Sequence, residues 1–444
     1  GDKHPGSLRY SSKLFLNANN DNFYQGNLIN LREPNSLRKL RPSNRLLWQA
    51  FNYFSNQLDT LGDIIDDGLF LSNFITETIA KKLLFIEITV EDDVNAYTVF
   101  ETLNSRGVEL SATDLLKNYI FSKFTSEDDL ISGQREWQEI TRTVGMNKFP
   151  EFLKYFLSMT RSRVRNKDLF KLTKKKVSNA EQAFDLLAQL NKFSELYVAL
   201  GNPNDSFWLD FDNVRAIRSS IDELILFRTK QAYPVLFSAY KAFSKQNFER
   251  LLKIVTVISF RYISVSGLNP NDLEKQYNSL ANRISDGKVK SPKAAFNVIS
   301  SLYIKDEKFR QDFASMTLTD KKKKLLQYIL QSLEKDKSGK GVTIDDFSIE
   351  HVLPQNPDEG WFQYFRDDEI DEAIYRLGNI TPLEQSSNAR LGTKPYEEKK
   401  KVYQSSSYEI TKNIVADEWT MSAIVNRQER MADRATHIWR IGYA

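Results

Sequence analysis

The sequence predicts a mainly α-helical protein that ends in a small region of two strands and several helices. From residue 131 to residue 335, apolar residues recur at helical spacing, and short polar breaks separate the segments. Near the C-terminus, residues 347–353 and 377–383 have the length and apolar character of short strands. Pro354 ends the first of them, because proline cannot donate a hydrogen bond to a strand ladder.

Composition narrows the class of protein. The 444 residues are enough for two or three domains, and the hydrophobic fraction of 41% can build their cores. Cysteine is absent, which excludes disulfides, zinc sites with thiolate ligands and cysteine nucleophiles, and fits a reducing cytoplasm. The net charge is +4, so any surface for nucleic acid must be a local patch.

We expect a soluble, cytoplasmic protein with no membrane partner. The chain starts with polar residues and lacks the apolar core of a signal peptide. Its most apolar window, residues 251–268, is interrupted by Lys253 and Arg261, so we do not expect it to span a bilayer.

We predict three regions, at residues 1–130, 131–340 and 341–444. The second boundary rests on residues 335–341, where Lys, Asp, Ser and Gly alternate as in a flexible hinge.

Within the first region, apolar residues at 46–61 indicate an amphipathic helix, and residues 84–90 alternate as a strand does. A helix at 94–103 follows, and Ser111 is the predicted N-cap of the next helix.

The last region combines the two strands with four helical segments. A helical stretch runs through residues 361–370, and a short capped helix covers residues 386–392. Another helix begins at Pro395, which favours the first helical turn. A final long helix starts after Thr420 and turns an apolar stripe inward.

The residues suited to catalysis lie in this last region. Of the three histidines in the chain, only His351 has many oxygen donors around it: Glu350 precedes it, and Asn388 follows the second strand. A histidine with a pKa of about 6.5 is mostly neutral at pH 7 and can take a proton from water. Carboxylate and amide oxygens hold hard divalent ions. Structural readings stay open, since Asn379 can form an Asx turn beside Gly378, and Asn388 can be an ordinary polar residue early in a helix.

A geometric condition applies to Glu350 and His351, which are adjacent in the sequence. Adjacent residues of a regular strand point to opposite faces. Glu350 and His351 can therefore share a site only if the strand bends, or if one of them acts through another group.

Four stretches carry a family resemblance: Glu-His-Val-Leu-Pro-Gln at 350–355, Leu-Gly-Asn-Ile-Thr-Pro-Leu at 377–383, Asn388, and Tyr-Glu-Glu-Lys at 396–399. Together they resemble the C-terminal domain of GmrSD-type restriction proteins, an HNH (ββα-metal, His-Me finger) nuclease domain. The resemblance runs from about residue 345 to residue 440 and implies that fold for the C-terminal region. Here Glu stands where the more usual residue before the histidine is Asp.

The resemblance also implies a role for each residue. His351 activates water, Glu350 and Asn388 hold Mg²⁺ or Mn²⁺, Asn379 braces the strand that carries the site, and Lys399 contacts phosphate. The implied function is a metal-dependent DNA endonuclease or nickase of a bacterial modification-dependent restriction system. Its partner would be modified phage DNA, met in anti-phage defence, and a homo-oligomeric assembly stays open.

A second resemblance covers residues 100–118, which begin Phe-Glu-Thr-Leu-Asn-Ser-Arg-Gly. This stretch is similar to part of the GmrSD N-terminal domain, a ParB-like, nucleotide-using module with an Asp-Gly-Gln-Gln-Arg motif. That motif does not occur in the sequence. We therefore expect nucleotide binding only if the full-length protein carries it. Alternatively, Asn104, Arg106 and Gly107 simply end a helix.

Basic residues provide candidate contacts to DNA. Arg427, Arg430 and Arg434 recur on one stripe of the final helix, and Arg390 and Lys394 follow Asn388 closely. We predict that all five contact DNA. The alternative for the stripe is an ordinary solvated helix face, and the lysine runs at 321–324 and 174–176 also fit solvated runs.

Two function classes remain in competition. The first is the nuclease described above. The second is a non-catalytic module that binds DNA or a partner on a degenerate HNH fold. Metal binding that depends on Asn388 or Glu350 distinguishes them.

Overall fold

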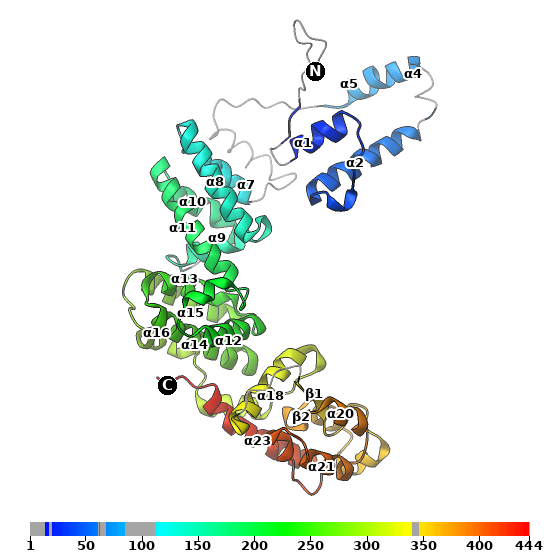
Figure 1. Ribbon diagram of the computed structural model, residues 1–444, viewed down its shortest axis with the longest axis vertical. Coiled ribbons are helices and arrows are strands. Elements are labelled where there is room, and N and C mark those ends of the chain that lie inside the picture. Colours follow the sequence, from blue (N-terminus) through cyan, green and yellow to red (C-terminus); the bar gives the residue numbers. More distant parts are fainter. Residues whose placement is uncertain are drawn as a thin grey trace. The chain divides into compact units, whose positions relative to one another are not determined.

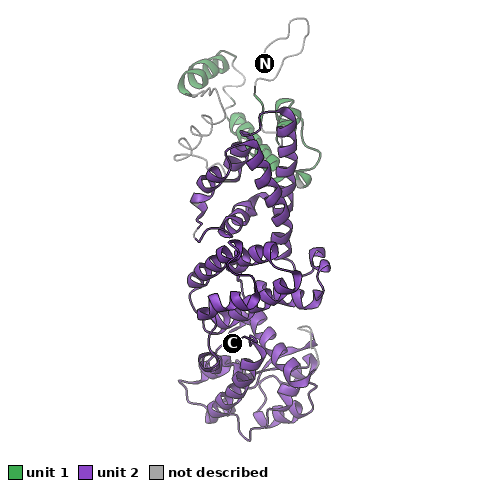
Figure 2. Cartoon of the chain, turned by 90° about the vertical axis from the view of Figure 1, so that its left-hand side faces the viewer, with its two compact units in different colours: residues 1–89 green, residues 90–444 purple. Residues whose placement is uncertain are grey.

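The computed structural model describes residues 14–16, 20–60, 62, 68–84, 112–162, 164–339 and 346–443. These residues are mainly helical and contain one two-stranded sheet, which confirms the predicted mainly α class (Figure 1). The chain divides into two compact units, residues 1–89 and residues 90–444 (Figure 2). No helix in the described part of the chain is both long and apolar enough to cross a membrane.

The described part of the first unit consists of helices: α1 (Asp21–Phe23), α2 (Pro42–Asp59), α4 (Gly68–Asn73) and α5 (Ala80–Lys82). The predicted helix at residues 46–61 is confirmed as α2, which begins earlier because Pro42 occupies its first turn. The predicted helix at 94–103, the N-cap at Ser111 and nearly all of the predicted strand at 84–90 lie outside the described residues.

The second unit begins with a helical body made of α7 to α18. Its helices are α7 (Ala112–Phe121), α8 (Glu127–Val144), α9 (Phe149–Ser158), α10 (Leu169–Lys176), α11 (Ala180–Ala199), α12 (Val214–Leu226), α13 (Tyr233–Ala242), α14 (Lys245–Ser259), α15 (Pro270–Ser285), α16 (Pro292–Ile299), α17 (Asp306–Ala314) and α18 (Lys323–Ser338). Several begin at a side chain that accepts a backbone N–H of the first turn, as Ser126 does for α8 and Asn179 for α11.

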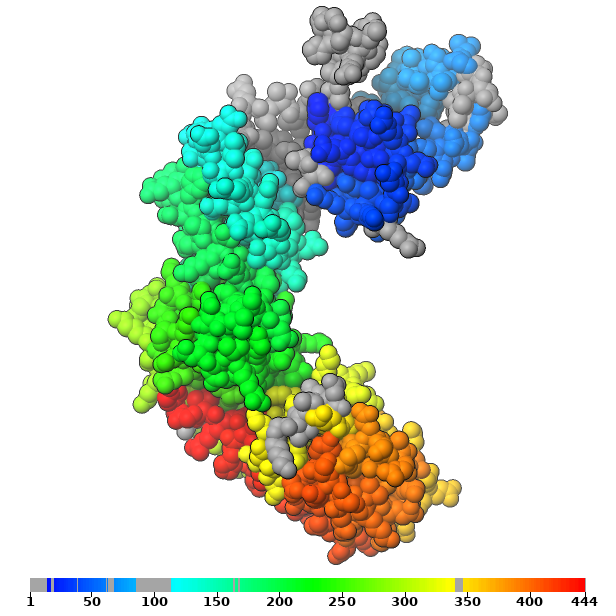
Figure 3. Space-filling view, in the orientation of Figure 1, coloured from blue at the N-terminus to red at the C-terminus, as the bar shows by residue number. Residues whose placement is uncertain are grey.

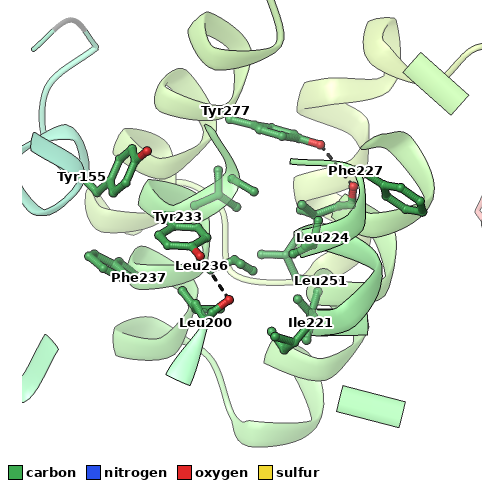
Figure 4. Packing of buried hydrophobic residues seen from close by; sticks show 14 of the residues in the cluster. Tyr155, Leu200, Ile221, Leu224, Phe227, Tyr233, Leu236, Phe237, Leu251 and Tyr277 are labelled. Atoms are coloured by element: carbon green, nitrogen blue, oxygen red, sulfur yellow. Dashed lines mark hydrogen bonds between the residues drawn. The ribbon is translucent and has the colours of Figure 1, made fainter. Parts of the chain in front are cut away.

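One continuous apolar core runs through the helical body (Figure 4). Large aromatic side chains fill it, and their polar atoms find partners inside. For example, the Tyr233 hydroxyl donates to the carbonyl of Leu200 at 3.1 Å, and the Tyr277 hydroxyl donates to the carbonyl of Val255 at 3.3 Å.

The C-terminal region, residues 346–443, contains both strands and the remaining helices. Its elements are β1 (Ser348–His351), α19 (Ile370–Tyr375), β2 (Ile380–Leu383), α20 (Gln385–Leu391), α21 (Tyr396–Gln404), α22 (Glu409–Lys412) and α23 (Met421–Ile438). The strands are antiparallel, with His351 opposite Ile380 and Glu350 opposite Thr381. Both predicted strands are confirmed, although each is only four residues long.

Two local predictions were wrong. The single helix predicted through residues 361–370 is a 3₁₀ helix (Glu359–Tyr364) followed by α19, and Phe365 between them is extended. Residues 335–338, predicted as part of a flexible hinge, form the last turn of α18. Gly339 ends that helix at φ 69°, a left-handed conformation in which glycine meets no steric cost. The boundary predicted at residue 340 stays a prediction.

The C-terminal region packs directly on the helical body. Helix α18 contacts β2, α22 and α23, and Figure 3 shows it (yellow) beside them (orange to red). On α23, the Gln428 amide donates to the carbonyls of Phe313 and Met316 at 2.8 and 2.9 Å. Its oxygen accepts the N–H of Gly378 at 3.2 Å. A Cβ at Gly378 would lie 2.1 Å from the Ile424 carbonyl oxygen, so this contact requires glycine.

A second attachment holds the end of α23. The fully buried Arg261 donates to the Trp439 carbonyl at 2.6 Å, and the Trp439 ring stacks on Phe260 with centroids 4.3 Å apart. The last helix therefore joins the C-terminal region to the helical body at its middle and at its C-terminal end.

Candidate active site

The β1–β2 hairpin places Glu350 and His351 on opposite faces of β1, because side chains alternate along a strand. Glu350 points to α21, where its Oε1 accepts from Lys399 Nζ and from the Tyr403 hydroxyl, both at 2.7 Å. Lys399 Nζ also donates to the His351 carbonyl at 3.0 Å. The imidazole of His351 lies on the other face and is half-buried. The strand does not bend enough to bring the two side chains together.

The Glu350–Lys399 pair lies in the protein interior, with 5% and 0% of the side chains exposed. Burial raises the pKa of the Glu350 carboxyl and lowers that of the Lys399 ammonium, because loss of hydration outweighs their attraction for each other. The predicted contact of Lys399 with phosphate is wrong for this structure, since the ammonium is enclosed and hydrogen-bonded within the protein.

Asn379 is fully buried and uses both ends of its amide. Its Oδ1 accepts from the Leu353 N–H at 2.7 Å and from the Trp419 indole at 2.9 Å. Its Nδ2 donates to the carbonyls of Leu353 at 2.9 Å and Ile374 at 3.1 Å. These bonds fix the segment that follows His351. They leave no hydrogen-bonding capacity for a substrate, so Asn379 acts as a positioning residue.

Asn388 lies on α20, which packs against β1. Its Nδ2 donates to the Ser348 hydroxyl at 2.8 Å and to the Ile349 carbonyl at 2.9 Å. The structure therefore brings Asn388 to β1 at residues 348 and 349, and its sharing a site with His351 stays a prediction. Its Oδ1 makes no hydrogen bond to any described residue.

Two residues near His351 were missed by sequence reasoning. The ring of Tyr375 meets the imidazole edge-on, with centroids 6.5 Å apart. Asp320 accepts from the Gln355 amide at 3.2 and 3.3 Å, and its charge acts on the imidazole.

Backbone pairing brings Asp320 to this place from the helical body. The Leu318 N–H donates to the Tyr375 carbonyl at 2.8 Å, and Thr317 forms a bridge with Arg376. No local sequence signal announces this pairing, because the two segments are far apart in the chain.

The imidazole of His351 is neutral at pH 7. Burial lowers its pKa to about 4, because the charged form loses hydration. Asp320 raises the pKa and Lys399 lowers it, and both effects are smaller than that of burial. An unprotonated imidazole can accept a proton.

The predicted DNA contacts fall into two groups. Arg427 is buried, and its guanidinium donates to the carbonyls of Gly378 and Ile380 at 2.7 and 2.9 Å, so its predicted contact with DNA is wrong. Burial lowers its pKa to about 10. The helix stripe to which it belongs is therefore only partly a solvated face.

The other four predicted contacts remain at the surface. Arg430 and Arg390 are exposed, and Arg390 Nε donates to the Ser386 carbonyl at 3.0 Å. Lys394 pairs with Glu398 at 3.1 Å, and Arg434 is half-buried in an ion pair with Asp336.

A further cationic surface lies beside Asp320. Residues 321–324 are four consecutive lysines that span the end of a 3₁₀ helix (Asp320–Lys322) and the first two residues of α18, and all are exposed. None of them forms an ion pair with a described residue. Among the described residues they are therefore cations without an ion-pair partner, and they follow a residue that acts on His351.

Two family models match the chain. One describes GmrSD restriction endonuclease, N-terminal domain, and matches residues 6–121. The other describes GmrSD restriction endonucleases, C-terminal domain, and matches residues 303–434. The second match includes Asp320 and α18 together with His351. A search of curated proteins found no match.

Replacing Lys399 by Met should destabilise the protein strongly. It would leave the Glu350 carboxylate buried without its cation, which costs about 3–5 kcal/mol. Chemical denaturation measures the loss. Combining Lys399→Met with Glu350→Gln should restore most of it.

The matched control is Lys400→Met, which removes a surface lysine paired with the exposed Asp417. It should change stability by less than about 1 kcal/mol. Equal losses for Lys399→Met and Lys400→Met would refute the buried-pair account.

Stability should depend on pH through His351. The folded protein resists protonation down to pH about 4, whereas the unfolded chain binds the proton near 6.5. The contribution of the neutral imidazole is therefore fully present above pH 6.5 and is lost as pH falls toward 4. The difference amounts to about 3 kcal/mol.

Urea denaturation between pH 6.5 and pH 4 measures whether the free energy of unfolding falls with falling pH, as predicted. His351→Gln should lose less stability than wild type between pH 6.5 and 4, with His437→Gln as the control for loss of an imidazole. An NMR titration that places His351 near pH 6.5 would contradict the prediction.

Proposed function

Because the chain belongs to the GmrSD-type restriction endonuclease family, we propose that its C-terminal region cuts DNA as an HNH (His-Me finger) nuclease with His351 as general base. The family is one of DNA endonucleases with a role in restriction, so DNA is the partner. The observation that carries the proposal is a neutral imidazole on a β-hairpin, with a helix bearing Asn388 packed on the same strand.

In this proposal, His351 accepts a proton from the water that attacks the phosphodiester. Asn379 holds the backbone after His351, and Lys399 holds the His351 carbonyl from the opposite face of the strand. Tyr375 limits the directions in which the imidazole can turn. These residues position the base and do not themselves touch substrate.

The metal ligands that we propose differ from the pair predicted from the sequence. Glu350 does not fit as a ligand, because its carboxylate is buried and bound to Lys399 and Tyr403. Asn388 fits, since its Oδ1 is not bonded to any described residue, and Asp320 offers an exposed carboxylate that acts on His351. We propose that Asn388 and Asp320 hold Mg²⁺ or Mn²⁺. A bound divalent ion would stabilise the negative charge on the phosphate and the leaving oxygen.

The residues that we propose to contact DNA also differ from those predicted from the sequence. We propose that residues 321–324 hold the phosphate backbone beside His351, together with Arg390, Lys394, Arg430 and Arg434. The lysines support this role because they are exposed, form no ion pair with a described residue and follow Asp320 in the chain. Arg427 is excluded by its burial.

The biological setting rests on the family resemblance. We propose restriction of modified phage DNA in the bacterial cytoplasm, as a monomer or homo-oligomer. Nucleotide use by the GmrSD-type N-terminal module would require the Asp-Gly-Gln-Gln-Arg motif, which this sequence does not contain.

The competing class is a non-catalytic binding module. Among the described residues, no group of three His, Cys, Asp or Glu side chains could hold a metal ion, so the proposed metal site needs the Asn388 amide as a ligand. Cleavage assays separate the two classes directly.

Replacing His351 by Ala should lower plasmid nicking by about 10²–10⁴-fold, because the proton acceptor is lost. The assay follows conversion of supercoiled plasmid with Mg²⁺ or Mn²⁺. Asn388→Ala and Asp320→Asn should raise the metal concentration needed for half-maximal cutting, whereas Asn426→Ala, at an exposed position on α23, should not.

Equal cutting by wild type and His351→Ala would remove His351 as the base. No cutting by folded wild type with either metal would favour the binding module.

Replacing residues 321–324 by Ala should weaken DNA binding and lower its dependence on salt. Each lost phosphate contact reduces the slope of log K against log salt by about 1. Filter binding or fluorescence anisotropy with a DNA duplex measures both, with the His351→Ala chain as background so that the duplex stays intact. The matched control replaces the other lysine run, residues 174–176. If both replacements have the same effect, the run at 321–324 has no special role.

A further inference from the structure

The helical body contains a cavity of about 850 Å³ that the nuclease proposal does not use. Residues of α8, α9, α11, α12, α13 and α15 line it, together with the turn that joins α12 to α13. Figure 4 shows Tyr155 and Tyr233, two of the lining residues, near each other among the buried residues of the apolar core.

Positive charge dominates the lining. Lys154 pairs with Glu274 at 2.8 Å, and Lys230 pairs with Glu151 at 3.0 Å. Two further cations, Lys148 and Arg228, also line the cavity. Neither of them forms an ion pair with a described residue. The cavity therefore carries two uncompensated positive charges, which suit an anion of the charge of a phosphate.

A network of tyrosines forms one wall. The hydroxyls of Tyr155 and Tyr197 donate to Glu151 at 3.1 and 2.9 Å, and these bonds with Lys230 lower the pKa of Glu151 although burial opposes it. The rings of Tyr155 and Tyr233 lie 5.2 Å apart. Only 5–9% of each of these tyrosines is exposed, so the wall offers a ligand a small aromatic surface, and the polar ends of the rings are already satisfied. A flat ring could contact the wall only over that surface.

Amide groups complete the lining. Asn202 and Gln231 both border the cavity. Gln231 Oε1 is buried and has no hydrogen-bond partner among the described residues. A buried acceptor without a donor carries a free-energy cost, and a ligand N–H or O–H would remove that cost.

The backbone at Arg228 is strained. Its φ is 55°, in the left-handed region that glycine and asparagine occupy with least strain. The turn ends α12, with the Thr229 N–H bonded to the Leu224 carbonyl at 3.0 Å. Glycine would form this turn at lower conformational cost, and arginine adds a cation at the cavity. Strain of this kind is found at binding sites.

We propose that this cavity binds a phosphorylated nucleoside, with Lys148 and Arg228 on the phosphate, the tyrosine wall beside the base, and the Gln231 amide on a polar group of the ligand. The same chemistry occurs in a free nucleotide and in one nucleotide unit of a DNA strand. The site is separate from His351 and does not depend on the nuclease proposal.

Binding to the whole chain carrying His351→Ala, without divalent metal, tests the proposal independently of cleavage. The probes are AMP, inorganic phosphate and a twelve-residue oligothymidylate, measured by calorimetry or fluorescence. Arg228→Gln and Lys148→Ala should each weaken binding about tenfold or more. Arg250→Gln, at an exposed arginine of α14 outside the cavity, is the matched control and should leave binding unchanged.

The probes identify the source of the ligand. Loss of AMP binding in Arg228→Gln means a free nucleotide, whereas loss confined to the oligothymidylate means a nucleotide unit of DNA. Binding of phosphate as tight as that of AMP would overturn the nucleoside assignment. Binding that does not respond to Arg228→Gln, or responds equally to Arg250→Gln, would overturn the site. Arg228→Gly should fold at least as stably as wild type while losing the ligand, which separates binding from folding.

Discussion

The alternation of side chains along β1 is the constraint on which the candidate site depends. It sends Glu350 into the interior and leaves His351 on the other face, so the two neighbours serve different purposes. A buried carboxylate needs a cation and hydrogen bonds, and Lys399 and Tyr403 supply both. Lys399 also donates to the His351 carbonyl. The Glu350–Lys399 ion pair therefore fixes the backbone of His351 from the face of β1 opposite the imidazole. A structural pair thus determines where the imidazole lies.

Buried cations elsewhere also serve the fold. Arg427 and Arg261 both direct their guanidinium groups to backbone carbonyls, the first at the β2 hairpin and the second at the end of α23. A planar guanidinium offers five donors, so one side chain can satisfy several carbonyls that helices and turns leave open. Positive charge in this sequence is therefore a poor guide to DNA contact until burial is known. The exposed lysines at residues 321–324 are the opposite case, since none of them forms an ion pair with a described residue.

Local physics made much of the fold predictable. Residue periodicity gave the helical body and the two strands, and Pro42 and Gly339 behave as helix signals usually do. The wrong predictions concern features that residue periodicity does not determine. The stripe that contains Arg427 and Arg430 has helical spacing, but spacing does not tell which part of a stripe faces the protein. Residues 335–338 look like a hinge by composition, yet packing of α18 on α22 and α23 keeps them helical.

The candidate site was predictable only in part, because one of its residues comes from a distant part of the chain. Sequence order pointed to His351, Asn379 and Asn388. The structure places Asn379 against the segment that follows His351, and Asn388 against residues 348 and 349 of β1. Asp320 could not be found in this way, because it reaches His351 through backbone pairing between the end of α17 and the end of α19.

That pairing has a consequence for how the protein is organised. If Asp320 and the lysines that follow it act with His351, the helical body contributes both a carboxylate and a cationic surface to the C-terminal region. The boundary between the two regions would then run through the site. The match of the C-terminal family model from residue 303, ahead of Asp320, agrees with that arrangement. Anything that moves α18 against the hairpin would change the surroundings of the imidazole, which gives the helical body a direct physical route to control cutting.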